Sequence, residues 1–413
     1  MRRYLLLLLA AALALGIALS PLCPLPPLVL FLSLTAVVAC LVAAHLKGWS
    51  RAFLCLAFLA FVIVGLWRAG QGDWHLLPQC LEGFALRLRE LARGRLYSLP
   101  LSDEAKSLLD AMMFAQRASL SADVRHLYSE AGAGHLLALS GLHLGILFGL
   151  LYLCLLQGVE YVLLRRSLAI VGIVAMWAYA LLVGFPVSLV RASVMMTLLF
   201  VSQLRLSGSF SWHTLALAAL LILFVSPSSL GSVSLQLSFT SVAGLLLFYE
   251  PLYGTLRSFN YTLNWLWGAF VVSVSAQIGS LPLVAYYFHQ YSLYSVLLSP
   301  VYIFLATFIL YLALLSLLFA TPFLCSCVSA LVSSQHGLMR LVASLPFSVW
   351  RDIRLSPAQV ALLYMTILCL APTVYGVRKK GDETAALQLA YYLRLWPYTV
   401  AAILCLLAVY LLA

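Results

Sequence analysis

The feature that most constrains this chain is a succession of long apolar segments with very few charges. Stretches such as "LVLFLSLTAVVACLVAAHL" and "AFLCLAFLAFVIVGLW" come close to the roughly 20 residues that a helix needs to cross a bilayer. Only 9% of the residues are charged and 64% are hydrophobic, so lipid must be the main solvent of the folded chain. In lipid only helices or closed barrels satisfy every backbone polar group, and these runs are too long for the short alternating strands of a barrel. The sequence therefore predicts an all-α fold, a polytopic integral membrane helical bundle of about 10–12 transmembrane helices with broken or re-entrant segments.

The distribution of positive charge orients the predicted helices. The net charge is +11, and in a membrane protein such an excess mostly keeps Lys and Arg in cytoplasmic loops. Three N-terminal spans that start from a cytoplasmic N-terminus place Arg68 outside, and Arg165 with Arg166 mark a return to the cytoplasm. Further spans are expected at 168–184, 187–204, 212–226, 233–249, 263–285 and 295–318.

The region from Thr321 to Arg354 is amphipathic and is compatible with a tilted span, a re-entrant segment or an interfacial helix. If the next apolar run ends in the cytoplasm at the basic residues 378–380, this region must cross the membrane. A final span from Tyr391 then leaves the C-terminus extracytoplasmic.

Composition divides the chain into four parts. We expect an N-terminal three-helix membrane segment at 1–67, an extracytoplasmic loop at 68–133, the main membrane domain at 134–376, and a cytoplasmic basic loop with the final transmembrane helix at 377–413. Acidic and basic side chains balance in the loop, where "FALRLRELARGRLY" predicts an amphipathic helix against lipid headgroups or against a polyanion. The nine cysteines lie mostly in apolar runs without metal-ligand spacing, so no metal site and no cofactor is predicted.

Polar residues interrupt the apolar segment "HLLALSGLHLGILFGLLY" near its start. Ser140 and His143 share one face of a helix, and His135 precedes them. Polar groups on a lipid-facing surface would cost several kcal/mol unless they are satisfied internally. These three residues are therefore candidates to line a water-filled cavity, while hydrogen bonding between helices is the competing interpretation. A Ser140–His143 nucleophile pair is the third, although the span itself contains no acidic residue that would complete a triad.

Further candidate pore-lining residues occur in three later membrane segments. Arg191 follows Phe185-Pro186, where it either reaches the interface or lines a re-entrant mouth. Neutral polar groups in membrane runs suit helix-to-helix bonding and a hydrated conduit equally well. The candidates of this second kind, with a histidine in an aromatic-rich turn and a proline within the run, are Gln236, Ser238, Gln277, Pro282 and His289.

Four stretches carry a resemblance to a known family: "AGAGHLLALSGLHLGIL", "VRASVM", "SLQLSFTSVAG" and "SAQIGSLPLVAYYF". In this order they resemble the membrane domain of the ComEC family, the DNA-internalisation channel of natural competence, over roughly Leu108 to Tyr375. The resemblance implies a competence-type channel domain in which one DNA strand passes through a pore lined or braced by the polar residues above. It also implies location in the bacterial inner (cytoplasmic) membrane and a periplasmic DNA receptor as a partner.

The sequence departs from full-length relatives in two respects. The loop at 68–133 is too short for a full OB domain, and no His-x-His-x-Asp-His cluster is present. We therefore expect a short form that lacks the metallo-β-lactamase-like domain and has no nuclease activity. No phosphate-binding loop is present either, so a cytoplasmic ATP-driven DNA translocase is expected as a partner. Monomer and homodimer both stay open.

Three functions from different classes compete. A non-enzymatic channel for single-stranded DNA leads, and membrane lipids complete its expected partners. A small-molecule secondary transporter is the first alternative, although inverted repeats and intramembrane carboxylates for ion coupling are not apparent. A membrane-embedded hydrolase that uses Ser140 and His143 is the second, and replacing Ser140 by Ala would abolish its turnover.

Overall fold

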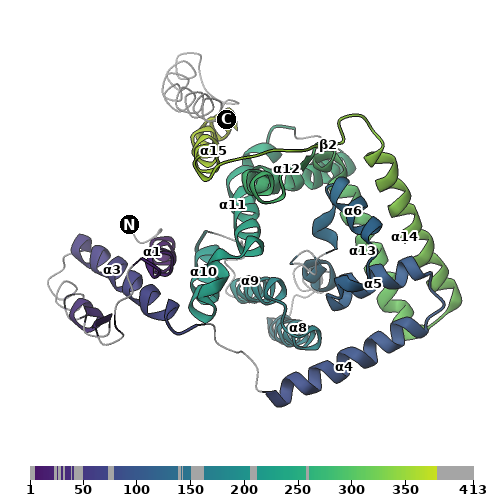
Figure 1. Cartoon of the computed structure of the whole chain (residues 1–413), viewed down its shortest axis with the longest axis horizontal. Helices are drawn as coiled ribbons and strands as arrows, with labels where there is room; N and C mark the ends of the chain where they lie inside the picture. The colour runs from purple at the N-terminus through teal and green to yellow at the C-terminus, as the bar shows by residue number, and fades with distance from the viewer. Residues whose placement is uncertain are drawn as a thin grey trace. The chain divides into compact units, whose positions relative to one another are not determined.

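The computed structural model describes residues 5–22, 26, 29–30, 33–38, 40, 50–72, 79–137, 141, 143–149, 162–204, 212–256 and 260–378. These residues are almost entirely helical (Figure 1). The fold class predicted from the apolar runs is therefore confirmed. In the part of the chain that is described, strands are limited to β1 (Tyr291–Ser292) and β2 (Val349–Trp350), which pair antiparallel.

The helices fall at the predicted places. Four helices are long and apolar enough to cross a membrane, at 166–183, 233–253, 261–288 and 295–319, and five shorter apolar helices accompany them among the described residues. The second predicted span lies largely outside the described residues, as does almost all of the part at 377–413. The α-helices are α1 (Leu5–Leu19), α3 (Ser50–Ala69), α4 (Gln79–Ser98), α5 (Asp103–Phe114), α6 (Ala122–Glu130), α8 (Val162–Val183), α9 (Val187–Leu204), α10 (Trp212–Val225), α11 (Val233–Tyr253), α12 (Tyr261–Phe288), α13 (Ser295–Phe319), α14 (Pro322–Ala343) and α15 (Pro357–Arg378). Short 3-10 turns are η2 (Arg117–Ser119), η3 (Gly134–Leu136) and η4 (Pro227–Gly231).

The chain forms two compact units, each built from two stretches of sequence. Unit 1 comprises 1–92 and 140–236, and unit 2 comprises 93–139 and 237–413. One boundary between the units falls between residues 139 and 140, directly before the Ser-Gly pair that interrupts the apolar run.

In unit 1, α1 packs against α3 and α10, and α9 packs against α8 and α10. The α1–α3 crossing is close because Gly16 and Gly65 face each other, and a Cβ added at Gly16 would lie 2.1 Å from the Val62 carbonyl oxygen. Small residues of this kind let helix backbones approach in lipid, where the hydrophobic effect does not drive association.

Two arginines tie helix ends together in unit 1. Arg68 is fully buried and donates to the last carbonyls of α10, from Nε to Phe224 at 2.6 Å and from Nη2 to Val225 at 2.7 Å, with a further bond to Gly72. Arg89 of α4 donates to the Val183 carbonyl oxygen at the end of α8, at 3.1 Å. These carbonyls have no intrahelical partner, so the arginines cap them. The C-terminal ends of α3 and α10 therefore lie next to each other.

In unit 2, α12 packs against α13 and α15. Its crossing with α11 is also close because of a glycine, as at Gly16 in unit 1. A Cβ added at Gly279 would lie 2.1 Å from the Thr240 carbonyl oxygen. The Tyr364 hydroxyl of α15 also donates to the Gly279 carbonyl oxygen, at 3.0 Å. Three helices of the main membrane domain thus meet at one glycine.

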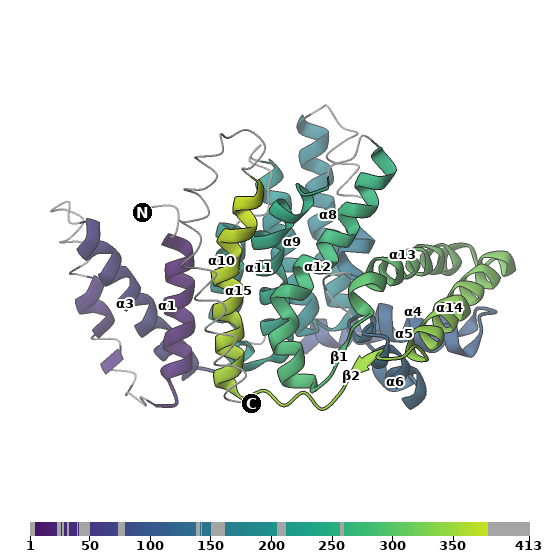
Figure 2. The same ribbon diagram turned by 90° about the horizontal axis from the view of Figure 1, so that it is seen from above.

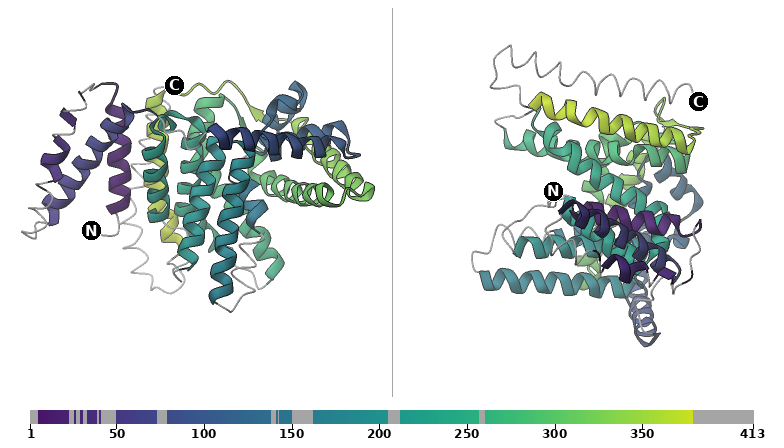
Figure 3. Two further views of the ribbon diagram at one scale, coloured as in Figure 1. Left: turned by 90° about the horizontal axis from the view of Figure 1, so that it is seen from below. Right: turned by 90° about the vertical axis from the view of Figure 1, so that its left-hand side faces the viewer.

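The region that the sequence leaves ambiguous forms α14, which pairs with α13 as an antiparallel hairpin. In Figure 1 both helices are seen lengthwise, whereas α15 is seen nearly end-on. Figures 2 and 3 show the same hairpin lying across the direction of α15. Helices α5 and α6 of the polar loop pack against α14, and their first turns are capped by the hydroxyls of Ser102 and Ser121.

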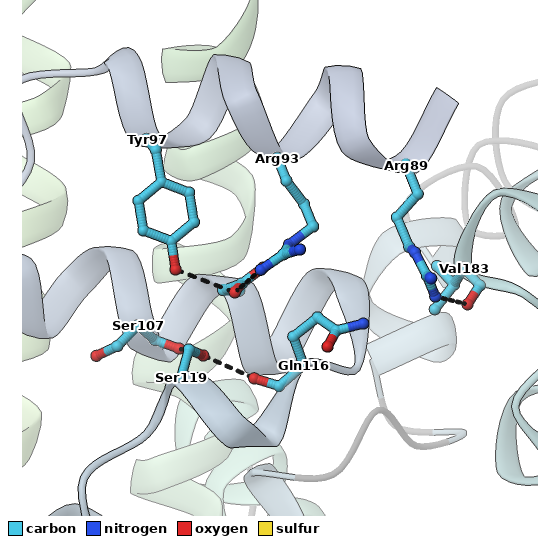
Figure 4. Close-up of polar contacts among 8 residues, drawn as sticks. Arg89, Arg93, Tyr97, Ser107, Gln116, Ser119 and Val183 are labelled. Atoms are coloured by element: carbon cyan, nitrogen blue, oxygen red, sulfur yellow. Dashed lines mark hydrogen bonds and ion pairs between the residues drawn. The ribbon is translucent and has the colours of Figure 1, made fainter. Parts of the chain in front are cut away.

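A buried ion pair fixes the loop part of unit 2. The Asp110 carboxylate of α5 is fully buried and accepts two hydrogen bonds from Arg93, at 2.7 and 2.8 Å, and one from the Tyr97 hydroxyl at 3.1 Å (Figure 4). Burial raises the pKa of Tyr97, and the adjacent Asp110 carboxylate raises that pKa further. The bidentate geometry satisfies the buried carboxylate, which makes this cluster a structural clamp.

Candidate functional site

The structure separates the predicted site residues into two groups. His143, Arg191 and Gln236 belong to unit 1, whereas the others belong to unit 2. Ser140 lies outside the described residues. The unit 2 group consists of His135, Ser238, Gln277, Pro282 and His289.

A tight turn places Arg191 in the second turn of α9. Gly184 and Phe185 both adopt positive φ, and the Phe185 amide donates to the Ala180 carbonyl oxygen at 2.8 Å. The Pro186 carbonyl then accepts from Leu189 at 2.8 Å, which starts the helix. Proline pre-sets this start because its missing N–H would have no partner there. The "FPVSLVR" stretch thus folds α9 back beside α8 and turns Arg191 into the interior.

Arg191 is buried, with 3% of its surface exposed. Its Nη2 donates to the Ser234 hydroxyl at the start of α11, at 2.5 Å. Within the described part of the chain, its Nε and Nη1 have no hydrogen-bond partner, and neither does the hydroxyl of fully buried Ser193. An interior guanidinium normally has its five donors satisfied by carboxylates or carbonyls. Arg191 therefore keeps donors directed at a group that the described chain does not supply.

Gly141 approaches the same helix. A Cβ added at Gly141 would lie 3.2 Å from the Ala192 Cβ, so this glycine permits close contact with α9 beside Arg191. His143 is completely buried two residues further on. Gln236 is half-buried, and its amide donates to the Leu230 carbonyl oxygen at 3.1 Å, which braces η4.

Gln277 lies at the centre of a closed polar network in unit 2. Its Nε2 donates to the Ser273 hydroxyl at 3.0 Å, the Ser295 carbonyl oxygen at 3.3 Å and the Ser299 hydroxyl at 3.4 Å. Its Oε1 accepts from the Tyr291 hydroxyl at 2.8 Å and from the Ser295 hydroxyl at 3.2 Å. Both ends of the amide are satisfied, so the network joins α12 to α13.

The first half of the "AGAGHLLALSGLHLGIL" stretch closes against this network. Gly132 has φ +70°, and a Cβ there would lie 2.5 Å from the Ser295 Cβ and 2.8 Å from the Ser292 Cβ. Only glycine fits this conformation and this contact. The stretch is thus shared between the two units, with Gly132 in unit 2 and Gly141 in unit 1.

The remaining candidates show different surroundings. His135 is exposed in η3, Pro282 is buried within α12, and Ser238 is half-buried in α11. His289 ends α12 with φ 54°, and its Nδ1 lies 3.2 Å from the Ile353 carbonyl oxygen. Among the residues that the structure describes, no group of His, Cys, Asp and Glu could hold a metal ion.

Sequence reasoning missed the partners of the two central groups. Ser234 lies two residues before Gln236 in a serine-rich stretch, where nothing local distinguishes it from its neighbours. Tyr291 and Ser295 lie in the aromatic turn after α12, and their role follows only from the return of the chain onto that helix. Tertiary pairing selects these residues, and sequence spacing does not reveal it.

Fold and site together define a polytopic helical membrane protein in which Arg191 is buried with two nitrogens unbonded among the described residues and Gln277 lies in a closed amide network. The chain belongs to the competence protein family, whose family model, described as "Competence protein", matches residues 112–375. This match confirms the resemblance noted from the sequence motifs.

Two curated relatives are similar to the chain over about half its length. ComE operon protein 3 of Bacillus subtilis (strain 168) is 30% identical over 215 residues, which cover 49% of this chain and 26% of the relative. Recombination protein 2 of Haemophilus influenzae is 31% identical over 216 residues, which cover 48% of this chain and 27% of the relative. The chain thus matches about a quarter of the length of these relatives, and no solved structure matches it.

Proposed function

We propose that this protein conducts single-stranded DNA across the bacterial inner membrane during natural transformation, and that Arg191 contacts the sugar–phosphate backbone in transit. Membership of the competence protein family supports the process. The name of one relative, a recombination protein, accords with DNA as the cargo. The channel acts without catalysis of its own.

The observation that carries the proposal is the buried, underbonded guanidinium of Arg191. A charge in a membrane interior is costly and marks a pathway unless it is paired. Phosphate oxygens complement a guanidinium with two parallel hydrogen bonds. A phosphodiester passing Arg191 would therefore supply the acceptors that the described protein does not.

One guanidinium, that of Arg191, also suits the movement of a DNA strand past it. Affinity for nucleic acid grows with the number of phosphates that are neutralised, so a dense row of arginines would hold the strand. Among the described residues, the polar group that Arg191 bonds is the neutral hydroxyl of Ser234. A conduit must bind strongly enough to admit its cargo and weakly enough to release it, and this composition meets both demands.

Orientation and partners complete the proposal. We place the N-terminus in the cytoplasm, the C-terminus outside, and on the periplasmic side the end of α3 with the ends of α10 and α8, which Arg68 and Arg89 cap. A periplasmic receptor would deliver the strand there. A cytoplasmic ATP-driven translocase would pull it, and the channel is either a monomer or a homodimer.

The test is DNA transfer in a deletion strain of a naturally competent host complemented with variants of the full chain. Arg191→Glu should lower the amount of labelled DNA that reaches the cytoplasm by roughly 100-fold or more, because a like charge facing phosphate costs several kcal/mol. Arg191→Lys keeps the charge but loses the planar fork, so it should transfer partially. DNA bound at the cell surface should stay unchanged.

Arg125→Ala is the matched control, because Arg125 is an exposed arginine of α6. It should transfer DNA normally. Normal transfer by Arg191→Glu at unchanged membrane abundance would reject the contact, and normal transformation of the deletion strain would reject the function.

A further inference from the structure

We propose that the α13–α14 hairpin lies along the membrane surface on the side of α5 and α6, with the exposed face of α13 immersed in the acyl chains of that leaflet. Length and composition alone make α13 a candidate span. The contacts at both ends of the hairpin point to another placement.

The near end of the hairpin lies against the polar loop. The antiparallel pair of β1 and β2 joins the residues just before α13 to those after α14. Gln290, next to β1, donates to the Ser129 hydroxyl of α6 at 2.7 Å. Arg351, after β2, bonds Glu130 of the same helix. The hairpin therefore begins and ends beside α6.

The far end of the hairpin lies against the same loop. The Ser102 amide, just before α5, donates to the Ser329 hydroxyl in the second turn of α14 at 3.0 Å. Further along α14, His336 Nδ1 lies 3.0 Å from the Glu104 carboxylate. Arg95 of α4 also reaches the Leu317 carbonyl oxygen near the end of α13, with Nε at 3.5 Å.

These contacts are incompatible with a span. At 1.5 Å per residue, the 25 residues of α13 extend roughly 37 Å, enough to bring its far end to the opposite surface. That end instead lies beside residues 95–104, and the near end lies beside residues 129–130. A segment as charged as 95–130 cannot thread the hydrocarbon core. Both ends of α13 must therefore be on one side.

The two faces of the hairpin identify what covers it. The buried side of α13 carries Tyr302, Ala306, Ile309 and Ala313, whereas its opposite side is exposed and bears no polar or charged group between Leu297 and Phe308. An apolar stripe of this length in water would be a liability for a folded protein. The exposed large side chains of α13 are Leu297, Val301, Phe304, Phe308, Leu315, Leu318 and Phe319.

Helix α14 presents a different surface. Its exposed positions between Ser326 and Arg340 are small or polar, whereas Phe323 and Leu341 near its two ends are exposed and apolar. The hairpin is thus amphipathic as a pair, with α13 suited to lipid and α14 suited to the aqueous layer of α5 and α6. This division is the one that helices lying in the interface show.

Cysteine accessibility tests the placement. In a full-length background with the nine cysteines replaced, single cysteines are introduced at Thr321 in the hairpin turn, at Ala118 in the polar loop and at Thr255 at the end of α11, all three exposed. An impermeant maleimide should label Thr321→Cys and Ala118→Cys from the same side and Thr255→Cys from the other. Labelling of Thr321→Cys together with Thr255→Cys would overturn the proposal.

Spin labels identify the occupant. In vesicles of phosphatidylethanolamine and phosphatidylglycerol, labels at Val301, Phe304, Phe308 and Leu315 should all report high oxygen access at one common depth, and a label at Ser333 should report water. A depth that rises and falls along α13 would indicate a span. Low access to both oxygen and a soluble nickel probe would indicate a protein partner such as a second copy. Either result rejects the lipid-covered hairpin, and neither depends on whether Arg191 contacts DNA.

Discussion

Arg191 in unit 1 and Gln277 in unit 2 are both polar groups that the sequence places within membrane segments, yet their surroundings differ. Arg191 has one partner, Ser234, and two nitrogens without a hydrogen bond among the described residues. Gln277 donates to three oxygens and accepts from two hydroxyls. The first cluster is open and the second is closed.

This difference separates binding from bracing. In a closed network, hydrogen bonds within the protein offset the free-energy cost of removing the polar groups from water. Its members therefore stabilise the fold and have no unbonded donor or acceptor for a ligand. In an open cluster this desolvation cost is not offset. Buried polar groups without partners persist in folded proteins chiefly where function needs them. The Arg93–Asp110–Tyr97 clamp of unit 2 belongs with the closed type, since its carboxylate accepts three bonds.

The largest expected effect on stability concerns that clamp. Asp110→Asn removes the buried counter-charge of Arg93 and should lower the free energy of unfolding by about 3 kcal/mol. Thermal unfolding of the purified full chain in detergent measures the change. Asp123→Asn on exposed α6 is the control and should leave the unfolding midpoint nearly unchanged.

A double variant then distinguishes lost charge pairing from lost packing. Arg93→Met combined with Asp110→Leu removes both charges and should recover most of the stability, because a buried pair replaced by apolar residues is often neutral. If Asp110→Asn left the midpoint unchanged, the clamp would not be a closed stabilising network.

The next effect concerns the amide network. Gln277→Leu leaves the Tyr291 and Ser295 hydroxyls without their shared acceptor and should cost about 2 kcal/mol in the free energy of unfolding. DNA transfer per molecule of membrane protein should stay constant, because bracing groups do not touch the cargo. Gln71→Leu, at an exposed position, provides the matched control. A fall in transfer at unchanged stability would place Gln277 on the path and remove the contrast with Arg191.

Arg191→Met should change the free energy of unfolding in the opposite direction to Asp110→Asn and Gln277→Leu. It fills a similar volume without burying unpaired donors, so the free energy of unfolding should rise by about 1 kcal/mol. Transfer of DNA should nevertheless fall, as for Arg191→Glu. A variant that gains stability while it loses transport is what an open binding cluster predicts. Loss of both would make Arg191 a structural residue.

The sequence predicts the fold more fully than the site. Apolar runs set the helix limits closely, as at 187–204 for α9 and 295–319 for α13, because lipid exposure requires continuous hydrophobicity. Sequence also identified Arg191 and Gln277 as unusual. The sequence could not show that Arg191 is underbonded and Gln277 fully bonded. That difference depends on which of Ser234, Tyr291 and Ser295 come within hydrogen-bonding distance.

The placement of α13 shows the limit of hydropathy as a predictor. Composition shows how apolar a helix is, whereas the direction of the helix relative to the membrane depends on which residues its two ends contact. Ser102 and Glu104 supply those contacts from a segment about 230 residues earlier. No local pattern in α13 encodes them, so hydropathy alone assigns a span.

The smallest expected effect on DNA transfer concerns Ser234, the hydrogen-bond partner of Arg191. Ser234→Ala removes the hydroxyl that accepts from Nη2, which leaves the guanidinium charged and buried but freer to rotate. One hydrogen bond is worth about 1 kcal/mol, so transfer should change by only a few-fold. Ser193→Ala, which removes a buried hydroxyl without a bond among the described residues, is the matched control and should transfer normally. If Ser234→Ala were as damaging as Arg191→Glu, the pair would act as one unit, and the cargo would contact the serine as well as the arginine.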